Sequence, residues 1–184
     1  YDFLRAVGIC DGKCTSEGNK EVGGIVWQLT PVGNNVAETW ENLVNGVSGA
    51  GPITHFDASK FKTQFACEVK NFNPNEHFDR KEVRKMDLYT QYAIVAAKEA
   101  IEDSAMDLEK VDKNKIGVIF GVGIGGIRTF EEEMIAYAGI KDTIGPKFNP
   151  FFIPKMIADI ASGHISKSMS GAKRFINRMA SIIP

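Results

Sequence analysis

The longest periodic run of apolar residues extends from about Lys81 to Ser104 and predicts one long helix. The apolar face of this helix is formed by Met86, Tyr89, Ala93, Ala96, Ala97, Ala100 and Ile101. Most of these side chains are alanines, which allow two helix axes to approach closely. We therefore expect this helix to lie deep in the fold.

A shorter helix is predicted over residues 36–44, before a glycine-rich loop from Gly46 to Pro52. Its apolar positions at helical spacing are Val36, Trp40, Leu43 and Val44. Asn35 is the expected N-cap, and Glu38 is placed to complete a capping box. Farther along, alternation over Phe65–Val69 predicts a short strand.

A buried strand is predicted at Ile116–Phe120, followed by the glycine-rich turn Gly121–Gly126 and a helix from about Arg128 to Tyr137. The next segment, 145–154, contains three prolines and is expected to be a loop. A helix followed by a strand, a glycine turn and another helix favours an α/β fold whose sheet is covered on both faces.

The glycines of the turn, Gly121, Gly123 and Gly126, also fit the G-x-G-x-x-G pattern of dinucleotide-binding turns. Such a site needs a second buried strand ending in an acidic residue that binds the ribose, and none is visible. Three glutamates at 131–133 would also repel a pyrophosphate. We therefore expect no nucleotide cofactor and interpret the glycines as permitting close approach of the backbone to another group.

Charge and composition exclude some partners without identifying one. The chain of 184 residues has 22 basic and 23 acidic side chains, so its formal charge is only −1. No global field therefore favours nucleic acid or an anionic membrane, and we expect neither as a partner. No apolar run is long enough to span a membrane.

The three cysteines, Cys10, Cys14 and Cys67, form no secreted disulfide pattern. With no signal-like N-terminus, this number suits a reducing compartment, and we expect a cytoplasmic location. Cys10 and Cys14 have no second ligand pair downstream, so we expect no zinc site and no other metal site.

Five ordered motifs together resemble the N-terminal part of a β-ketoacyl-acyl carrier protein synthase of type II fatty-acid elongation. The motifs are Leu29–Asn34, Ser48–Asp57, Arg80–Asp87, Gly123–Gly126 and Pro150–Pro154. Their order is uninterrupted from Leu29 to Ile165. This combination is far more specific than the glycine pattern alone.

The resemblance implies a thiolase-like fold with two similar halves layered as α/β/α/β/α, of which this chain holds the N-terminal half only. Residues 29–165 are expected to form this partial domain, between a divergent segment at 1–28 and a divergent tail at 166–184. Loss of resemblance at both ends suggests frame shifts or an aberrant gene model. The family acts as a homodimer.

The activity implied by the resemblance is acyl transfer followed by carbon–carbon bond formation. An acyl group moves from the thiol of acyl carrier protein to a cysteine, and a malonyl thioester then loses CO₂ and attacks the acyl-enzyme. A pair of histidines and a backbone oxyanion hole stabilise the charged intermediates. No cofactor is implied.

The family's catalytic residues are expected to lie beyond this chain. The nucleophile follows the helix matched by Ala161–Ser166, but no cysteine occurs after Cys67. The family's two histidines and its lysine come from the second half, so His55, His77 and His164 do not match them. We therefore expect this chain alone to be inactive.

Two groups of residues match binding positions of the family. Lys81, Arg84 and Lys85 match positions that dock the acidic carrier protein, although a solvated helix start is the ordinary alternative. Ile124 and Phe152 match positions that line the acyl-chain tunnel, Phe152 reaching in from the neighbouring subunit. As core residues, these two would need no special explanation.

Two further side chains are expected to be structural. His164 is predicted to be a packed, hydrogen-bonded histidine, and Cys67 to be an inert buried thiol on a strand. The alternatives to a condensing enzyme are a non-catalytic fragment that only binds acyl carrier protein, or a nonfunctional remnant.

Overall fold

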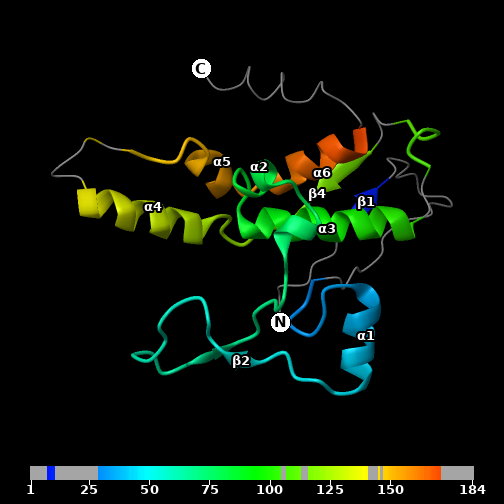
Figure 1. Cartoon of the computed structure of the whole chain (residues 1–184). Helices are drawn as coiled ribbons and strands as arrows, with labels where there is room; N and C mark the ends of the chain where they lie inside the picture. Colours follow the sequence, from blue (N-terminus) through cyan, green and yellow to red (C-terminus); the bar gives the residue numbers. More distant parts are fainter. Residues whose placement is uncertain are drawn as a thin grey trace.

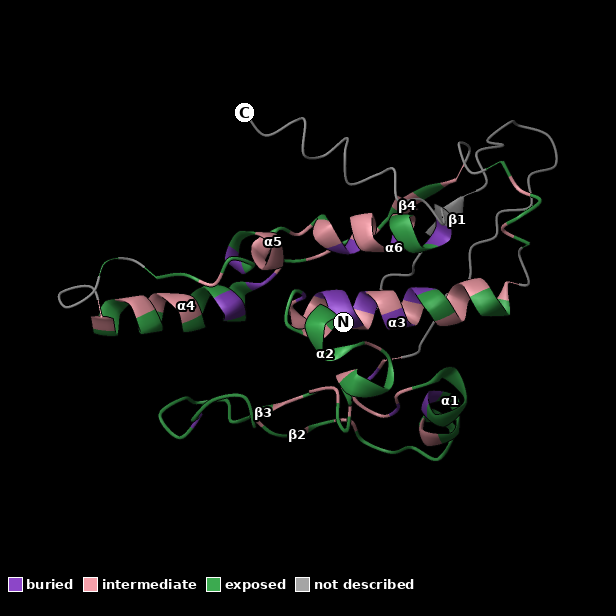
Figure 2. Ribbon diagram, turned by 45° about the horizontal axis from the view of Figure 1, so that its top comes forward, coloured by how far each residue is buried: buried purple, intermediate pink, exposed green. Residues whose placement is uncertain are grey.

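The fold is built around helix α3 (Leu88–Asp103), which packs along α6 (Ile160–Ser170) in the computed structural model (Figure 1). The structure describes residues 8–10, 29–104, 107–112, 116–140, 145 and 147–170. The buried core cluster consists of Ala93, Ala97, Ala161, Ile165 and Met169. Figure 2 shows the buried positions of α3 and α6 on the faces that they turn toward each other. The predicted alanine-rich face of α3 is thus confirmed as a core face.

The predicted helix over 81–104 is interrupted. Helix α2 (Arg80–Val83) ends early, and α3 begins again after Asp87. The Asp87 carboxylate accepts a hydrogen bond from the backbone N–H of Tyr89 at 3.3 Å and so caps α3. An aspartate that competes with the backbone for hydrogen bonds favours a new helix start over a continuous helix.

Strand β4 (Gly117–Ile119) confirms the predicted strand, although it is shorter than expected. It pairs antiparallel with β1 (Gly8–Cys10), with Ile9 opposite Val118. One side of β4 contacts α6. Ile119, however, is 82% exposed. In the part of the chain that the structure describes, β4 is therefore covered on one face and not on both.

The segment that precedes α2 forms a separate small unit below α3 (Figure 1). It contains α1 (Val36–Val44) and a two-residue antiparallel ladder between β2 (Gly51–Pro52) and β3 (Phe65–Ala66). A short 3₁₀ helix, η1 (Pro74–Glu76), leads into α2. Strand β3 covers only the first two residues of the predicted strand.

The predicted N-cap of α1 is formed, but the return hydrogen bond of the expected capping box goes to the residue before the cap. The Asn35 side chain accepts from the Glu38 N–H at 2.8 Å, whereas the Glu38 carboxylate accepts from the N–H of Asn34 at 2.8 Å. The buried hydroxyls of Thr30 and Thr39 lie 3.1 Å apart and join the preceding turn to this helix. These polar contacts fix α1 although few apolar contacts do.

The predicted apolar face of α1 is present but not buried. Val36, Trp40, Leu43 and Val44 are all exposed, and Trp40 is 68% exposed. Helical periodicity identifies a surface that is suited to burial, but it does not supply the partner that would bury it.

Helices α4 (Ile127–Ile140) and α5 (Phe152–Met156) lie side by side at one end of the molecule (Figure 1). Helix α4 begins and ends close to the predicted bounds. Helix α5 begins inside segment 145–154, which was predicted to be a loop, and extends two residues beyond it. Pro154 occupies the first turn of α5, where a missing N–H costs no helical hydrogen bond.

The close contact between α3 and α6 at Ala97 predicts that a larger side chain at this position destabilises the fold. Replacing Ala97 by leucine should lower the free energy of unfolding by about 1–3 kcal/mol, because the added atoms have no space between the two helices. Ala136→Leu, at an exposed position of α4, is the matched control and should change little. Urea unfolding followed by circular dichroism measures both; equal effects would contradict close packing at Ala97.

Candidate functional site

The glycine turn lies directly against the C-terminal end of α5. Gly125 has φ +83°, a conformation that L side chains rarely adopt. A Cβ at Gly125 would lie closer than 3.0 Å to the carbonyl oxygen of Met156, and one at Gly126 equally close to that of Lys155. The N–H of Gly126 donates to the Met156 carbonyl at 3.4 Å. Gly125 and Gly126 therefore permit contact between two backbone segments, as expected for Gly126, whereas a Cβ on Gly121 or Gly123 would meet no described atom.

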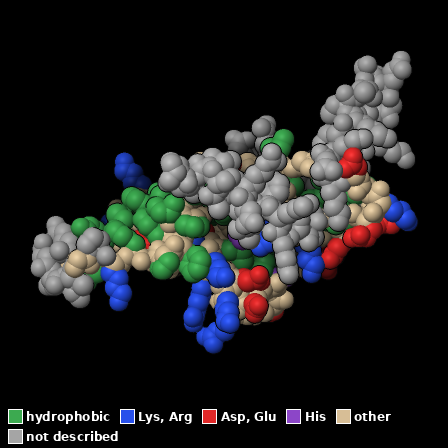
Figure 3. All heavy atoms as spheres, turned by 90° about the horizontal axis from the view of Figure 1, so that it is seen from above, with side chains coloured by type: hydrophobic (Ala, Val, Ile, Leu, Met, Phe, Trp, Pro, Cys, Tyr) green, Lys and Arg blue, Asp and Glu red, His purple; other side chains and the backbone are tan. Residues whose placement is uncertain are grey.

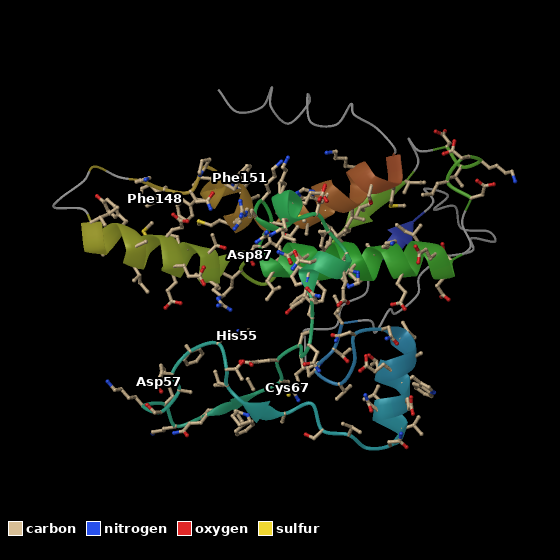
Figure 4. The ribbon with its side chains drawn as sticks, viewed as in Figure 1. His55, Asp57, Cys67, Asp87, Phe148 and Phe151 are labelled. Carbon is tan, nitrogen blue, oxygen red and sulfur yellow. The ribbon has the colours of Figure 1, made fainter. Side chains whose placement is uncertain are left out.

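Asp87 connects the start of α3 to the start of α4. Its second carboxylate oxygen accepts a short hydrogen bond from the hydroxyl of Thr129, which lies in the first turn of α4. The same oxygen lies 3.1 Å from the position that a Cβ on Gly126 would occupy. Figure 4 shows Asp87 at the beginning of α3, near the segment that carries Phe151.

Tyr89 extends this connection to α5. Its hydroxyl donates to the carbonyl oxygen of Ile157 at 2.6 Å, just after the last residue of α5. The pKa of Tyr89 is raised, first by burial of the phenol and then by the nearby charges of Asp87 and Asp159. The raised pKa keeps the hydroxyl protonated, as a donor must be.

Ile124 and Phe152 occupy different environments. Ile124 is 71% exposed on the glycine turn. Phe152 is buried in an aromatic cluster, with ring centroids 6.1 Å from Phe130 and 5.5 Å from Phe148. The described chain therefore does not enclose these two side chains in one cavity, so a shared acyl site would need another surface.

The three candidate carrier-docking residues are all exposed. Lys81 lies in α2, Arg84 is its C-cap residue, and Lys85 follows it. Among the ion pairs between described residues, none involves these three side chains. The ammonium group of Lys85 lies 5.7 Å from the centroid of the exposed Phe151 ring.

This basic group borders an apolar surface. Figure 3 shows hydrophobic side chains gathered at the end of the molecule that holds α4 and α5, beside basic side chains. The exposed apolar residues of this end include Ile127, Phe130, Ile135, Phe148, Phe151 and Ile153. Contiguous apolar surface rimmed by charge is typical of a surface that binds another molecule.

The prediction for Cys67 was wrong. The thiol is exposed, because β3 ends at Ala66 and the ladder has only two residues per strand. Figure 4 places Cys67 in the unit with His55 and Asp57, apart from Asp87 and Phe151. The exposed thiol therefore does not belong to the glycine-turn site.

His164 is partly buried on α6, as expected of a packed residue. The pKa of His164 is lowered from 6.5, first by burial and then by Lys167, while Glu82 opposes the shift. Among the described residues, no hydrogen-bond partner of the His164 side chain was found, so the expected hydrogen bond stays a prediction.

The described residues contain neither a metal-binding cluster nor a helix that could span a membrane. No three His, Cys, Asp or Glu side chains among the described residues are placed to hold a metal ion. The Cys10–Cys14 pair lies outside the residues whose side chains are described. No described helix has the length and hydrophobicity that crossing a membrane requires.

Comparison with known proteins decides the family. A family model described as the N-terminal domain of β-ketoacyl synthases matches residues 25–171. The chain belongs to the β-ketoacyl synthase family. The matched residues include the range 29–165, over which the sequence motifs follow one another.

Curated relatives carry the name 3-oxoacyl-acyl-carrier-protein synthase 2. The Staphylococcus aureus protein is 46% identical over 145 residues, which are 79% of this chain and 35% of that protein. The Coxiella burnetii protein is 42% identical over 139 residues, or 75% of this chain and 33% of that protein. The chain thus spans about a third of the length of these synthases.

Solved ketosynthases share the fold. The ishigamide ketosynthase/chain length factor aligns with a TM-score of 0.62 and 23% identity, covering 90% of this chain and 36% of that one. A type II polyketide ketosynthase, solved in complex with its acyl-carrier protein, aligns with a TM-score of 0.58 and 19% identity. It covers 89% of this chain and 38% of that one.

Sequence reasoning missed the roles of Asp87, Tyr89 and Thr129. Asp87 precedes the apolar start of α3, which is a recognisable N-cap pattern. Its second role, as acceptor for Thr129, joins residues 42 positions apart and has no local sequence signal.

The lowered pKa of His164 predicts acid sensitivity of this synthase domain. The unfolded chain takes up a proton near pH 6.5, whereas the folded chain does so only at lower pH. Stability is therefore retained above pH 6.5 and lost as the pH falls through the folded-state pKa. His164→Gln should reduce the drop in Tm between pH 7.5 and 5.5, and His77→Gln, at an exposed position, should not. An unchanged drop in His164→Gln would contradict this.

Proposed function

We propose that this chain serves as the N-terminal part of a 3-oxoacyl-acyl carrier protein synthase of type II fatty-acid biosynthesis. The observation that carries the proposal is the 46% identity to the Staphylococcus aureus synthase over 79% of this chain. The exposed basic group beside α5 supports it independently, because a fatty-acid synthase must receive its substrates from an acidic carrier.

The proposed reaction is a decarboxylative Claisen condensation. A cysteine thiolate attacks the acyl thioester, the carrier thiol leaves, and the acyl group remains on the enzyme. A malonyl thioester then loses CO₂, and the resulting carbanion attacks the acyl carbonyl. The new carbon–carbon bond replaces the bond to sulfur, which regenerates the thiolate. Decarboxylation supplies the electron pair, so the reaction needs no oxidant or reductant.

The proposal assigns binding and not bond-making to the residues of this chain. The family nucleophile has no match here, and the exposed Cys67 lies in the separate unit below α3 (Figure 4). We therefore propose that the chain alone does not condense thioesters and that the reacting groups belong to the part of the synthase that this chain does not match. The proposal places the protein in the cytoplasm.

Lys81, Arg84 and Lys85 are proposed to dock acyl carrier protein. All three side chains are exposed near one end of α3, and none forms an ion pair with a described acidic residue. Charges at the edge of an interface accelerate association and set its salt dependence. The contact of Lys85 with Phe151 places this charge beside the apolar surface.

Ile124 and Phe152 are proposed to contact the acyl chain across a homodimer. The exposure of Ile124 and the burial of Phe152 in its own chain leave them apart in one copy. A second copy is the simplest way to bring Ile124 of one subunit close to the α5 segment of the other. The exposed apolar residues at this end of the molecule supply the surface that such an association would bury.

Charge reversal tests carrier docking. Replacing Lys81 and Arg84 by glutamate should weaken binding of acyl carrier protein at low salt by about tenfold, because two attractive contacts become repulsive. Lys60→Glu with Lys62→Glu, in the exposed loop between β2 and β3, is the matched control. Fluorescence anisotropy of a labelled carrier measures both variants. Equal affinity of the two double variants for the carrier would reject the assigned surface. If a complete synthase that contains this chain binds the carrier but does not condense thioesters, the non-catalytic, carrier-binding alternative is favoured.

The acyl contact at Ile124 is tested in a chimeric synthase whose matched segment is replaced by residues 25–171 of this chain. Ile124→Phe should lower kcat/KM for long acyl thioesters relative to short ones by about 10-fold to 100-fold, because the larger ring occupies the proposed tunnel. Ile135→Phe, also at an exposed position, is the control. An unchanged chain-length profile would remove Ile124 from the site.

A further inference from the structure

One carboxylate joins the starts of α3 and α4 beside the glycine turn. The Asp87 side chain caps α3 through the Tyr89 N–H and accepts from the Thr129 hydroxyl at the start of α4. Thr129 is 9% exposed, so water does not readily replace this donor. A carboxylate that accepts hydrogen bonds from two helix starts restrains their relative position.

The same carboxylate limits where the glycine turn can lie. An oxygen of Asp87 would lie only 3.1 Å from a Cβ on Gly126, while the carbonyl of Lys155 closes the other approach. Gly126 thus passes between an aspartate and the end of α5. If the Asp87–Thr129 hydrogen bond is lost, one of these two restraints on the turn disappears.

Helix α5 is fixed from the same first turn of α3. The Tyr89 hydroxyl donates to the Ile157 carbonyl at 2.6 Å, directly after the last residue of α5. Asp87 and Tyr89 therefore hold the two segments that carry Ile124 and Phe152. Neither residue is itself one of the proposed acyl contacts.

We infer that Asp87 and Thr129 are positioning residues that set acyl chain-length preference by fixing the glycine turn relative to α5. This inference rests on the proposed acyl contacts of Ile124 and Phe152. It assigns selectivity to a partly buried polar pair that does not itself contact the acyl chain. Ile124 lies in the glycine turn, and this turn leads directly into the first turn of α4, which holds Thr129. A shift of the start of α4 therefore also moves Ile124.

The first test uses the 184-residue chain and amide hydrogen exchange. Thr129→Val removes the donor at nearly constant volume and leaves the Asp87 cap of α3 in place. Exchange should become at least about fivefold faster in peptides covering 121–130 and 152–157, because the loss of a hydrogen bond to a charged group releases both segments. Peptides covering α1 should not change, and Thr129→Ser should restore protection. Uniform acceleration, or none, would overturn the positioning role.

The second test measures chain-length preference in the chimeric synthase. Thr129→Val should change the ratio of kcat/KM for long and short acyl thioesters by at least about fivefold, and Thr129→Ser should keep the original ratio. Asp87→Asn retains an acceptor for the cap and provides a second variant if Thr129→Val folds poorly.

The outcomes separate this inference from the proposed function. If Ile124→Phe changes the ratio but Thr129→Val and Asp87→Asn do not, the positioning inference is wrong and the acyl contact stands. If Ile124→Phe has no effect, the acyl contact fails, and the selectivity role of Asp87 and Thr129 fails with it. A parallel fall in kcat/KM for all chain lengths would indicate a merely structural role and would also overturn the inference.

Discussion

The candidate site depends on contact between two stretches of backbone, the glycine turn and the end of α5. Side chains at Gly125 or Gly126 would overlap the carbonyl oxygens of Met156 and Lys155, so the contact exists only because these positions lack a Cβ. Close approach allows a direct N–H to carbonyl hydrogen bond between the segments. It also brings α4 and α5 near enough for Phe130, Phe148 and Phe152 to form one aromatic cluster. The missing side chains thus organise the packing of the larger ones around them.

Local features of this fold are readable from sequence, whereas their assembly is not. The cap at Asn35 and the alanine face of α3 were predictable because the interactions or the periodicity lie within a few residues. The interruption before α3 was missed because helical spacing continues through Asp87, and the apolar pattern outweighed the cap signal. The exposure of Trp40 shows the other limit. A hydrophobic pattern states which face is suited to burial, but burial itself requires a surface that the pattern does not contain.

The candidate site likewise has features that the sequence predicted and others that it could not predict. Lys81, Arg84 and Lys85 are exposed, as both carrier docking and a solvated helix start require, and the close approach expected of the glycines is present at Gly126 but not at Gly121 or Gly123. The link from Asp87 to Thr129 could not be inferred, because it depends on how α3 and α4 meet in space. Cys67 was misjudged because a strand prediction implies burial only if the strand is long enough to be covered. The proposed pairing of Ile124 with Phe152 could not be tested by sequence patterns, because the two residues lie in different environments within one chain.

The contact with α5 also explains why this glycine-rich turn after a strand is not suited to binding phosphate. A phosphate-binding turn presents free backbone N–H groups and the positive end of a helix to the anion. Here the N–H of Gly126 is donated to Met156, and two carbonyl oxygens with partial negative charge face the turn. The carboxylate of Asp87 adds a full negative charge beside the first turn of α4. A pyrophosphate at this place would have to displace a carbonyl and approach an aspartate. The electrostatics of the turn therefore favour an uncharged neighbour, such as a hydrocarbon chain beside Ile124, over a phosphate.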